Sequence, residues 1–484
     1  MAAPQKQENR GAVERMAATC YVTDRAMLKH WNPLKTWMPE RPKRLQVAHE
    51  LLQTRGLLDR ALILESRYAT DEELGLVHTK EHIELVRATE SMSLVEVTLE
   101  NHRLDPVTSI CQETNQCARL ACGCLLQAVD GVVSGKCRNG VALIRPPGHH
   151  SAAATVSGFC IFNNAAVAAR YAMQRYGLER ILIFDWDVHH GNGTQEIFYE
   201  SNCVLYVSLH RYSKEKIFPK TEISDATYIG KGAGRGYNIN IPWTKPAMTD
   251  ADYLTAMYQL VMPVASEFDP ELVIVSAGFD SAKGDILGDC CVTPAGYQHM
   301  TSLLKNLAHG RVIIQLEGGY NVDAVAESLA ACMATLMGEP CSSVTNMQPS
   351  ASAMHSIAKA KAAVSPYWKC LTAEPTPIVV EPQVDIETWQ IPILHCPHGN
   401  MISSLPSQGL SADLRGLDDV NKWICLRCFQ VLEGETKSEA LVEHAVKNQH
   451  LLVVNTHTLH VRCLSCRQGV IHKEFIPILA QLHK

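Results

Sequence analysis

Short runs of apolar and β-branched residues recur along the first 320 positions, and each run ends in polar residues. The five runs span residues 141–150, 180–193, 203–212, 271–280 and 311–320. Continuous apolar runs of this length predict strands that are buried on both faces. Between the runs, residues 165–173, 253–268 and 297–308 repeat apolar positions at helical spacing. This alternation predicts a parallel α/β sheet, in which ligands bind beyond the carboxyl ends of the strands.

The pattern changes beyond residue 340. Residues 354–371 have helical spacing and predict a terminal helix that packs on the core. A segment rich in proline and glutamate follows, and histidine and cysteine are then concentrated up to the last residue. We therefore predict four segments, which are an N-terminal tail at 1–17, a large α/β domain at 18–372, a linker at 373–390 and a small metal-dependent domain at 391–484.

Composition limits the partners that the chain can bind. Forty-four Lys and Arg against 50 Asp and Glu give a net charge of -6, so no global basic field attracts nucleic acid or an anionic membrane. Eighteen cysteines in 484 residues are too few for a disulfide scaffold and indicate a reducing compartment. No signal peptide or membrane-spanning run is recognisable. We expect a cytoplasmic and also nuclear location, and a solvated helix start at the short basic run 38–44.

A metal site is predicted where the second and fourth runs end. Asp187 and His189 have D-x-H spacing, so both side chains can point to the same side of an extended chain. A catalytic zinc needs about three protein ligands, and Asp280 at the end of another run is the natural third. A single aspartate at a strand end is more often a loop or capping carboxylate. Three such groups at neighbouring strand ends favour zinc.

Groups suited to amide hydrolysis end the other runs. His149 and His150 follow a proline turn, although tandem histidines also occur as surface residues. Asp185 lies on the same face of its strand as Asp187 and can orient one imidazole. Tyr320 follows two glycines that let the backbone approach the ion closely. A polarised carbonyl, a histidine base and a phenol donor are the parts of amide hydrolysis.

Five motifs carry a family resemblance across about residues 18–372, namely RPPGHH, GFCIFNNAAVA, DWDVHHGNGTQ, SAGFDSAKGD and LEGGYN. They resemble the class IIb zinc-dependent histone deacetylases of the arginase/deacetylase fold, and most closely those of the histone deacetylase 6 type. The resemblance implies hydrolysis of acetyl-lysine in tubulin or histones, with zinc held by Asp187, His189 and Asp280. It further implies that His149 and His150 share the acid and base work, that Asp185 and Asn192 orient them, and that Tyr320 stabilises the oxyanion.

The same resemblance assigns the substrate tunnel. Phe159 and Phe218 would line a narrow apolar slot for the lysine stem, although without the family both would be read as core. Leu287 falls where a polyamine-deacetylating relative carries an acidic gatekeeper, which favours peptide substrates over acetylspermidine. Two departures from the family, Met38 and Ile286, are expected at the rim and affect substrate preference more than catalysis.

The C-terminal segment contains two potential structural zinc sites. One is Cys425-x2-Cys428 followed by His444 and His450, close to zinc-finger spacing. The other combines Cys396, His398, Cys463 and Cys466. A reduced, metal-free domain is the alternative. Zinc would supply much of the folding energy of so small a domain.

The order of these motifs is similar to the ubiquitin-binding zinc finger of the UBP type. Here the finger is degenerate, because the C-x-x-C that opens the family's third site is replaced at 416–420, and its Cys-Gly-Arg is replaced at 432–434. Trp423 is retained but could equally be core, while Arg462 and Leu464 stand at the family's aromatic positions. The resemblance implies either ubiquitin or a scaffold protein as partner.

Two other function classes stay open at this stage. A catalytically inactive reader of acetylated or ubiquitinated partners is disfavoured, because every catalytic position of the family is filled. A ureohydrolase on the same fold would need two manganese ions, whereas one D-x-H and one distant Asp suit a single zinc better.

Overall fold

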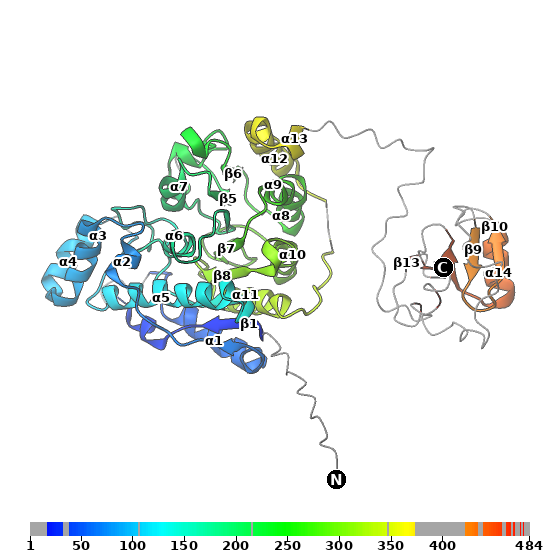
Figure 1. The fold of residues 1–484 in the computed structure, drawn as a ribbon, viewed down its shortest axis with the longest axis horizontal. Helices are drawn as coiled ribbons and strands as arrows, with labels where there is room; N and C mark the ends of the chain where they lie inside the picture. Colours follow the sequence, from blue (N-terminus) through cyan, green and yellow to red (C-terminus); the bar gives the residue numbers. More distant parts are fainter. Residues whose placement is uncertain are drawn as a thin grey trace, which may run out of the picture. The chain divides into compact units, whose positions relative to one another are not determined.

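The computed structural model describes residues 17–31, 38–104, 107–213, 216–345 and 348–372, and in the C-terminal part 422–433, 439–456, 461–465, 468–469, 475 and 478. The chain divides into two compact units, with the boundary between Ala373 and Glu374 (Figure 1). Each unit is described by itself. The predicted linker at 373–390 and nearly all of the predicted tail at 1–17 lie outside the described residues, so the predicted segment boundaries stay predictions.

The first unit contains an eight-stranded parallel sheet with the order β2-β1-β3-β8-β7-β4-β5-β6. The strands are β1 (Ala17–Val22), β2 (Leu62–Ile63), β3 (Cys137–Ala142), β4 (Ile181–Asp185), β5 (Val204–Arg211), β6 (Asn238–Trp243), β7 (Leu272–Ala277) and β8 (Val312–Leu316). Every residue of β4, β7 and β8 is buried. Because side chains alternate between the two faces of a sheet, both faces must be covered.

Helices provide that cover. Helix α5 packs on α6 and on strands β1 and β3, and helix α11 packs on α1, α10 and β3. The helices of the unit are α1 (Lys43–Thr54), α2 (Asp71–Leu74), α3 (Lys80–Ala88), α4 (Leu94–Arg103), α5 (Thr114–Val133), α6 (Asn164–Tyr176), α7 (Asn192–Phe198), α8 (Asp250–Ala256), α9 (Met262–Phe268), α10 (Pro294–Leu304), α11 (Val322–Leu336), α12 (Ala351–Val364) and α13 (Lys369–Thr372). No helix among the described residues is both long and apolar enough to cross a bilayer.

The predicted strands and the predicted α/β class are confirmed. The five apolar runs become β3, β4, β5, β7 and β8 of the parallel sheet. One predicted helix is not continuous, because residues Met257–Val261 form a π-helical turn between α8 and α9. Pro263, the second residue of α9, has no N–H to donate, which explains why the regular hydrogen-bond ladder is interrupted there.

The terminal helix predicted at 354–371 is present as α12 and α13. Trp368 fixes this segment to the core, since its ring packs against Tyr237 and Phe268. Its indole N–H donates a 2.9 Å hydrogen bond to the carbonyl of Gly236. Residues up to 372 therefore belong structurally to the catalytic unit.

The second unit is a small antiparallel sheet with one helix. Its strand order is β10-β9-β11-β12-β13. The elements are β9 (Lys422–Cys425), β10 (Val431–Glu433), α14 (Glu439–Asn448), β11 (Leu452–Asn455), β12 (Val461–Cys463) and β13 (Gln468–Gly469). Among the described residues, one apolar cluster consists of Trp423, Cys425, Leu432, Leu441 and Val453. Further buried apolar side chains, such as Ile424, Leu452 and Val454, add to the core. The core of so small a unit gives limited stability of its own.

Candidate active site and zinc sites

The candidate active site lies where β4, β7 and β8 end side by side. β4 pairs with β7 and β7 pairs with β8, so their carboxyl ends lie at one edge of the sheet. Asp187 and His189 follow β4, Asp280 follows β7, and Tyr320 follows β8. These four residues, distant in sequence, therefore meet for a purely topological reason.

Asp187, His189 and Asp280 form a compact ligand set. Nδ1 of His189 lies 3.1 Å from a carboxylate oxygen of Asp187 and 3.1 Å from one of Asp280. Each of the three residues offers one ligand atom, and these atoms lie within 4.8 Å of one another. A methyl group on Gly318 would overlap the carboxylates of both aspartates, so a glycine is needed beside them. Two carboxylates and one imidazole fit a zinc ion with an open coordination position.

The charges in this set are strongly coupled. Burial by itself would lower the pKa of His189, but hydrogen bonds with Asp187 and Asp280 outweigh it and raise the pKa to about 10. Burial, and then the charge of Asp187, raises the pKa of Asp280 to about 7. Two buried carboxylates that face each other need a cation between them, and a divalent metal meets that need better than a single proton.

The two histidines have different partners. Nδ1 of His149 lies 3.0 Å from a carboxylate oxygen of Asp185, whereas Nδ1 of His150 lies 2.8 Å from the amide oxygen of Asn192. Because an amide oxygen only accepts, Nδ1 of His150 must carry the proton, which leaves Nε2 free to act as a base. Burial and the neighbouring histidines hold the pKa of His150 well below 6.5. Despite burial, Asp187 and Asp185 raise the pKa of His149 well above 6.5.

A second group of side chains holds the histidine pair in place. The phenol of Tyr206 donates a 2.9 Å hydrogen bond to the same oxygen of Asp185 that faces His149. Glu317 accepts the backbone N–H groups of Gly148 and His149. Neither Tyr206 nor Glu317 was predicted as part of the site. The sequence does contain a signal for Glu317, because it is a charged residue directly after the buried run 311–316. Tyr206 has no such signal, since it looks like an ordinary strand residue.

Tyr320 is anchored by an unexpected buried ion network. Arg44 is fully buried, and its guanidinium lies 5.4 Å from the centre of the Tyr320 ring. It donates hydrogen bonds of 2.5 Å to the carbonyls of Gly319 and Glu317. Glu40 accepts from Arg44 and forms a 2.6 Å ion pair with Arg145. Burial would raise the pKa of Glu40, but the two arginines outweigh it and lower the pKa to about 2.

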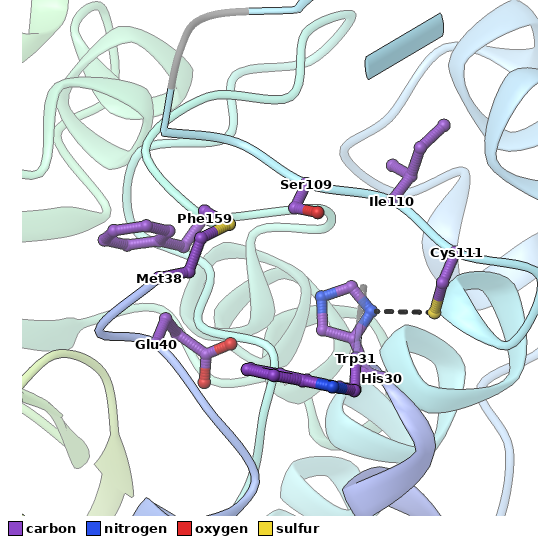
Figure 2. A pocket seen from close by; sticks show the side chains of 8 residues that line it. All are labelled: His30, Trp31, Met38, Glu40, Ser109, Ile110, Cys111 and Phe159. Carbon is purple, nitrogen blue, oxygen red and sulfur yellow. Dashed lines mark hydrogen bonds between the residues drawn. The ribbon is translucent and has the colours of Figure 1, made fainter. Parts of the chain in front are cut away.

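The prediction of a solvated helix start at 38–44 is therefore correct only in part: α1 begins at Lys43, and Arg41 and Lys43 are exposed, but Glu40 and Arg44 are buried. Arg44 and Glu40 are buried because each satisfies the other's charge, and the remaining donors of Arg44 meet backbone carbonyls. Met38, which was expected at the rim, is only 5% exposed. It lines the same small pocket as Phe159, His30 and Glu40 (Figure 2). The pocket volume is about 20 Å³, which is enough to hold a water molecule.

Both predicted tunnel phenylalanines lie at the site. The ring of Phe159 packs 5.7 Å from that of Tyr320, and the ring of Phe218 packs edge-on against His150 at 4.8 Å. Phe159 has a φ of 70°, a conformation that a bulky residue rarely adopts without a functional reason. Leu287 is 46% exposed in the loop that follows Asp280. The structure thus brings the predicted residues together, while their roles stay predictions.

The second unit contains one assembled cluster of zinc-ligand type. Cys425, Cys428, His444 and His450 each offer one ligand atom, and these atoms lie within 4.8 Å of one another. The sulfur of Cys428 lies 3.5 Å from Nε2 of His444. Nδ1 of His450 is buried and forms no hydrogen bond in the described part of the chain. Two thiols and two imidazoles are a common structural zinc set, and an unpaired buried nitrogen fits a missing ion.

The other predicted finger residues are only partly described. Cys463 is buried in β12, but Cys396, His398 and Cys466 lie outside the described residues, so the second zinc set stays a prediction. Trp423 is buried in the apolar core of the unit rather than exposed as a binding platform. Arg462 is half-buried in β12. Leu464 packs against the same core as Trp423.

Comparisons with known proteins agree with this geometry. Residues 38–336 match the family model of the histone deacetylase domain, and residues 416–475 match that of the zinc finger in ubiquitin hydrolases and other proteins. The crystal structure of the HDA15 HD domain superposes on this chain with a TM-score of 0.68 and is 39% identical in sequence. The match covers 74% of this chain and 97% of the HDA15 chain.

Among curated relatives, polyamine deacetylase HDAC10 of Homo sapiens is 48% identical over 333 residues, which are 69% of this chain and 50% of the relative. Histone deacetylase 6 of Caenorhabditis elegans is 33% identical over an alignment of 500 positions, gaps included, which covers 92% of this chain and 52% of the relative. The chain spans about half the length of the curated relatives it matches. The resemblance to class IIb enzymes is thereby confirmed, and the chain belongs to the histone deacetylase family, with a zinc finger of the UBP type following the deacetylase domain.

Proposed function

We propose that the protein is a zinc-dependent lysine deacetylase that hydrolyses acetyl-lysine in proteins such as tubulin or histones. The observation that carries this proposal is the meeting of Asp187, His189 and Asp280 with His150 and the buried Tyr320 at one sheet edge. Zinc bound to that ligand set would act as a Lewis acid on the acetyl carbonyl and would lower the pKa of water.

The side chains of this chain account for the proton transfers. Nε2 of His150 is free to accept a proton from the attacking water, because Nδ1 is held by Asn192. The water oxygen bonds to the acetyl carbon, and the C–N bond then breaks. His150 returns its proton to the leaving lysine nitrogen, so the products are acetate and a free lysine amine. The phenol O–H of Tyr320 donates to the oxygen that becomes negative during the attack.

The rim loop supports a protein substrate rather than a polyamine. A polyamine carries a second amine, which needs an anionic partner at the entrance. Leu287 is apolar, and the carboxylate of Asp285 accepts four backbone N–H groups. Asp289, two residues beyond Leu287, forms an ion pair with Arg211. The acidic groups of residues 285–289 therefore have partners already.

The decisive experiment compares an acetyl-lysine peptide of the tubulin type, an acetylated histone peptide and acetylspermidine, with zinc content measured on the same samples. Asp280→Ala should lose both zinc and turnover. Tyr320→Phe should keep zinc and lose about 100-fold or more in kcat. If the zinc-loaded wild type turns over none of the substrates, the protein is a reader of acetylated partners and this proposal fails.

Polyamine deacetylation is a second candidate, because relatives that are 46–48% identical are named polyamine deacetylases. Leu287→Glu tests it directly by placing an acidic group at the position where the resemblance expects the gatekeeper. We expect the wild type to prefer peptide, and the variant to shift the ratio of kcat/KM towards acetylspermidine by about 10-fold or more. A wild type that already prefers acetylspermidine would reverse the assignment.

We further propose that the C-terminal unit binds a protein partner, with ubiquitin as the candidate favoured by the match to zinc fingers of ubiquitin hydrolases. Titration with intact ubiquitin, and with ubiquitin lacking its two terminal glycines, separates the outcomes. Binding of the intact form alone would support capture of the free C-terminus. Binding of neither form would favour a scaffold protein as the partner.

We also propose a cytoplasmic and nuclear location, and imaging of the tagged chain tests it.

A further inference from the structure

We propose that Asp285 is a positioning residue, whose carboxylate holds Tyr320 where the phenol can donate to the oxyanion and links that placement to the rim loop. This inference rests on the proposed deacetylase function and on the role of Tyr320 in it. Asp285 has no part in the ligand set or in the proton transfers described above. Its role is inferred from the backbone groups that it binds.

Both carboxylate oxygens of Asp285 have defined partners. Oδ2 accepts the backbone N–H of Tyr320 at 2.6 Å and that of Asn321 at 3.0 Å. Oδ1 accepts the backbone N–H of Leu287 at 2.9 Å and that of Gly288 at 3.3 Å. One side chain thus joins the tyrosine backbone to the loop that carries Leu287. Charge-assisted hydrogen bonds of this kind are about twice as strong as neutral ones.

The backbone of Tyr320 needs such an anchor. Gly318 and Gly319 precede it, and Gly319 has a φ of 111°, so the chain itself restricts the direction of the tyrosine very little. Arg44 holds this segment from one side through the carbonyl of Gly319. Asp285 holds it from the amide side of Tyr320. A displacement of about 1 Å in a catalytic group can cost about 100-fold in rate, so both anchors have catalytic consequences.

An amide cannot replace this carboxylate. Four N–H donors converge on two acceptor oxygens, and asparagine offers only one oxygen. Its NH2 group would face two donors, which is unfavourable whichever way the amide is turned. The rim loop is tied to the same carboxylate, so the contact that a substrate makes with exposed Ile286 and Leu287 can be transmitted to Tyr320.

A double-mutant cycle tests this proposal on the full-length, zinc-loaded protein with an acetyl-lysine peptide. Asp285→Asn should lower kcat by about 10- to 100-fold, change KM by less than about 3-fold and retain zinc. In a Tyr320→Phe background, where there is no phenol to position, Asp285→Asn should cost less than about 2-fold more. If Asp285→Asn does not fold, Asp285→Glu gives the same cycle, because it keeps the charge but displaces it by one methylene.

Asp250→Asn is the matched control. Asp250 likewise accepts a backbone N–H, that of Thr293, and it accepts the Thr293 hydroxyl as well, but it lies at the start of α8 outside the site. This variant should leave kcat unchanged. Equal losses for Asp285→Asn in both backgrounds, loss of zinc, or an unchanged kcat would each overturn the proposal. A fully active Tyr320→Phe would instead refute the proposed function, so the two failures are distinguishable.

Discussion

Asp185 is the residue on which the asymmetry of the histidine pair depends. Its carboxylate faces Nδ1 of His149 and also accepts from Tyr206. Asp185→Asn should lower kcat by about 100-fold or more. The neutral amide does not stabilise the charged form of His149, and its NH2 group can favour the wrong tautomer of the imidazole. Steady-state kinetics with zinc analysis measure this. Tyr206→Phe, which removes one donor but no charge, should cost less than about 5-fold, and an equal loss in both variants would contradict the argument.

His30 makes stability depend on pH. It is buried, and Nδ1 lies 3.2 Å from the hydroxyl of Thr114. Burial, followed by the charge of Arg145, lowers its pKa from 6.5 to about 4. Between pH 6.5 and 4 the unfolded chain therefore binds a proton that the folded chain does not, so acidification across this window removes up to about 3 kcal/mol of stability.

The corresponding variant is His30→Asn, which keeps a polar atom near Thr114 but does not titrate. Urea unfolding of both proteins at pH 7 and pH 4.5 should show a smaller loss of unfolding free energy on acidification for the variant. His355→Asn alters an exposed histidine and serves as the control. If the wild type and His30→Asn lose the same free energy between the two pH values, His30 does not contribute to the dependence.

Side chains directly after buried strands were predictable, because the topology of a parallel sheet brings strand ends together. Asp187, His189, Asp280 and Tyr320 all have this signal in the sequence. The residues that were missed hold these in place from elsewhere. Arg44 lies in a basic run that looks solvated, and only the long-range pairs with Glu40 and the carbonyls at 317 and 319 explain its burial. No local pattern encodes such a partner.

At the scale of elements, hydrophobic runs predicted five strands but missed β1, β2 and β6, of which β2 and β6 are the edges of the sheet. Strands β1 and β6 contain alanine, asparagine or proline among their apolar residues, and they become strands because neighbouring strands supply hydrogen-bond partners. Pairing of this kind is a tertiary effect that overrides local propensity. The break between α8 and α9 has a signal in the sequence, because Pro263 interrupts the helical pattern.

The C-terminal helices of the first unit continue past the end of the family match at residue 336, yet they pack on its core. Trp368→Ala should therefore destabilise this unit by about 3–5 kcal/mol, since a buried indole and its hydrogen bond to Gly236 are lost. Thermal unfolding measures the effect, if it is monitored by far-ultraviolet circular dichroism, which reports the backbone and not the tryptophan. Met354→Ala, at a partly exposed position of α12, should cost less than about 1 kcal/mol. Similar values for both variants would show that the helices only lie on the surface.

At the scale of the whole molecule, the two units differ in what stabilises them. The first has a large continuous apolar core with buried residues from seven of its eight strands, whereas the described part of the second has a much smaller set of buried apolar residues beside a Cys and His cluster. Metal binding should accordingly be optional for the folding of the first unit and essential for the second. The sequence predicted this difference from composition alone, because histidine and cysteine are concentrated in the last hundred residues.

Removing zinc from the full chain should therefore unfold the second unit selectively. After treatment with a chelator, hydrogen-exchange mass spectrometry should show lost protection in β9, α14 and β11, while β4 and β7 stay protected, because the sheet of the first unit does not depend on the ion. Cys428→Ser, which removes one ligand, should reproduce this loss without a chelator. Cys370→Ser, at an exposed cysteine of the first unit, should not. If metal analysis shows that zinc is gone while β9 and β11 remain protected, the second unit folds as a metal-free domain and its Cys and His cluster is not a structural zinc site.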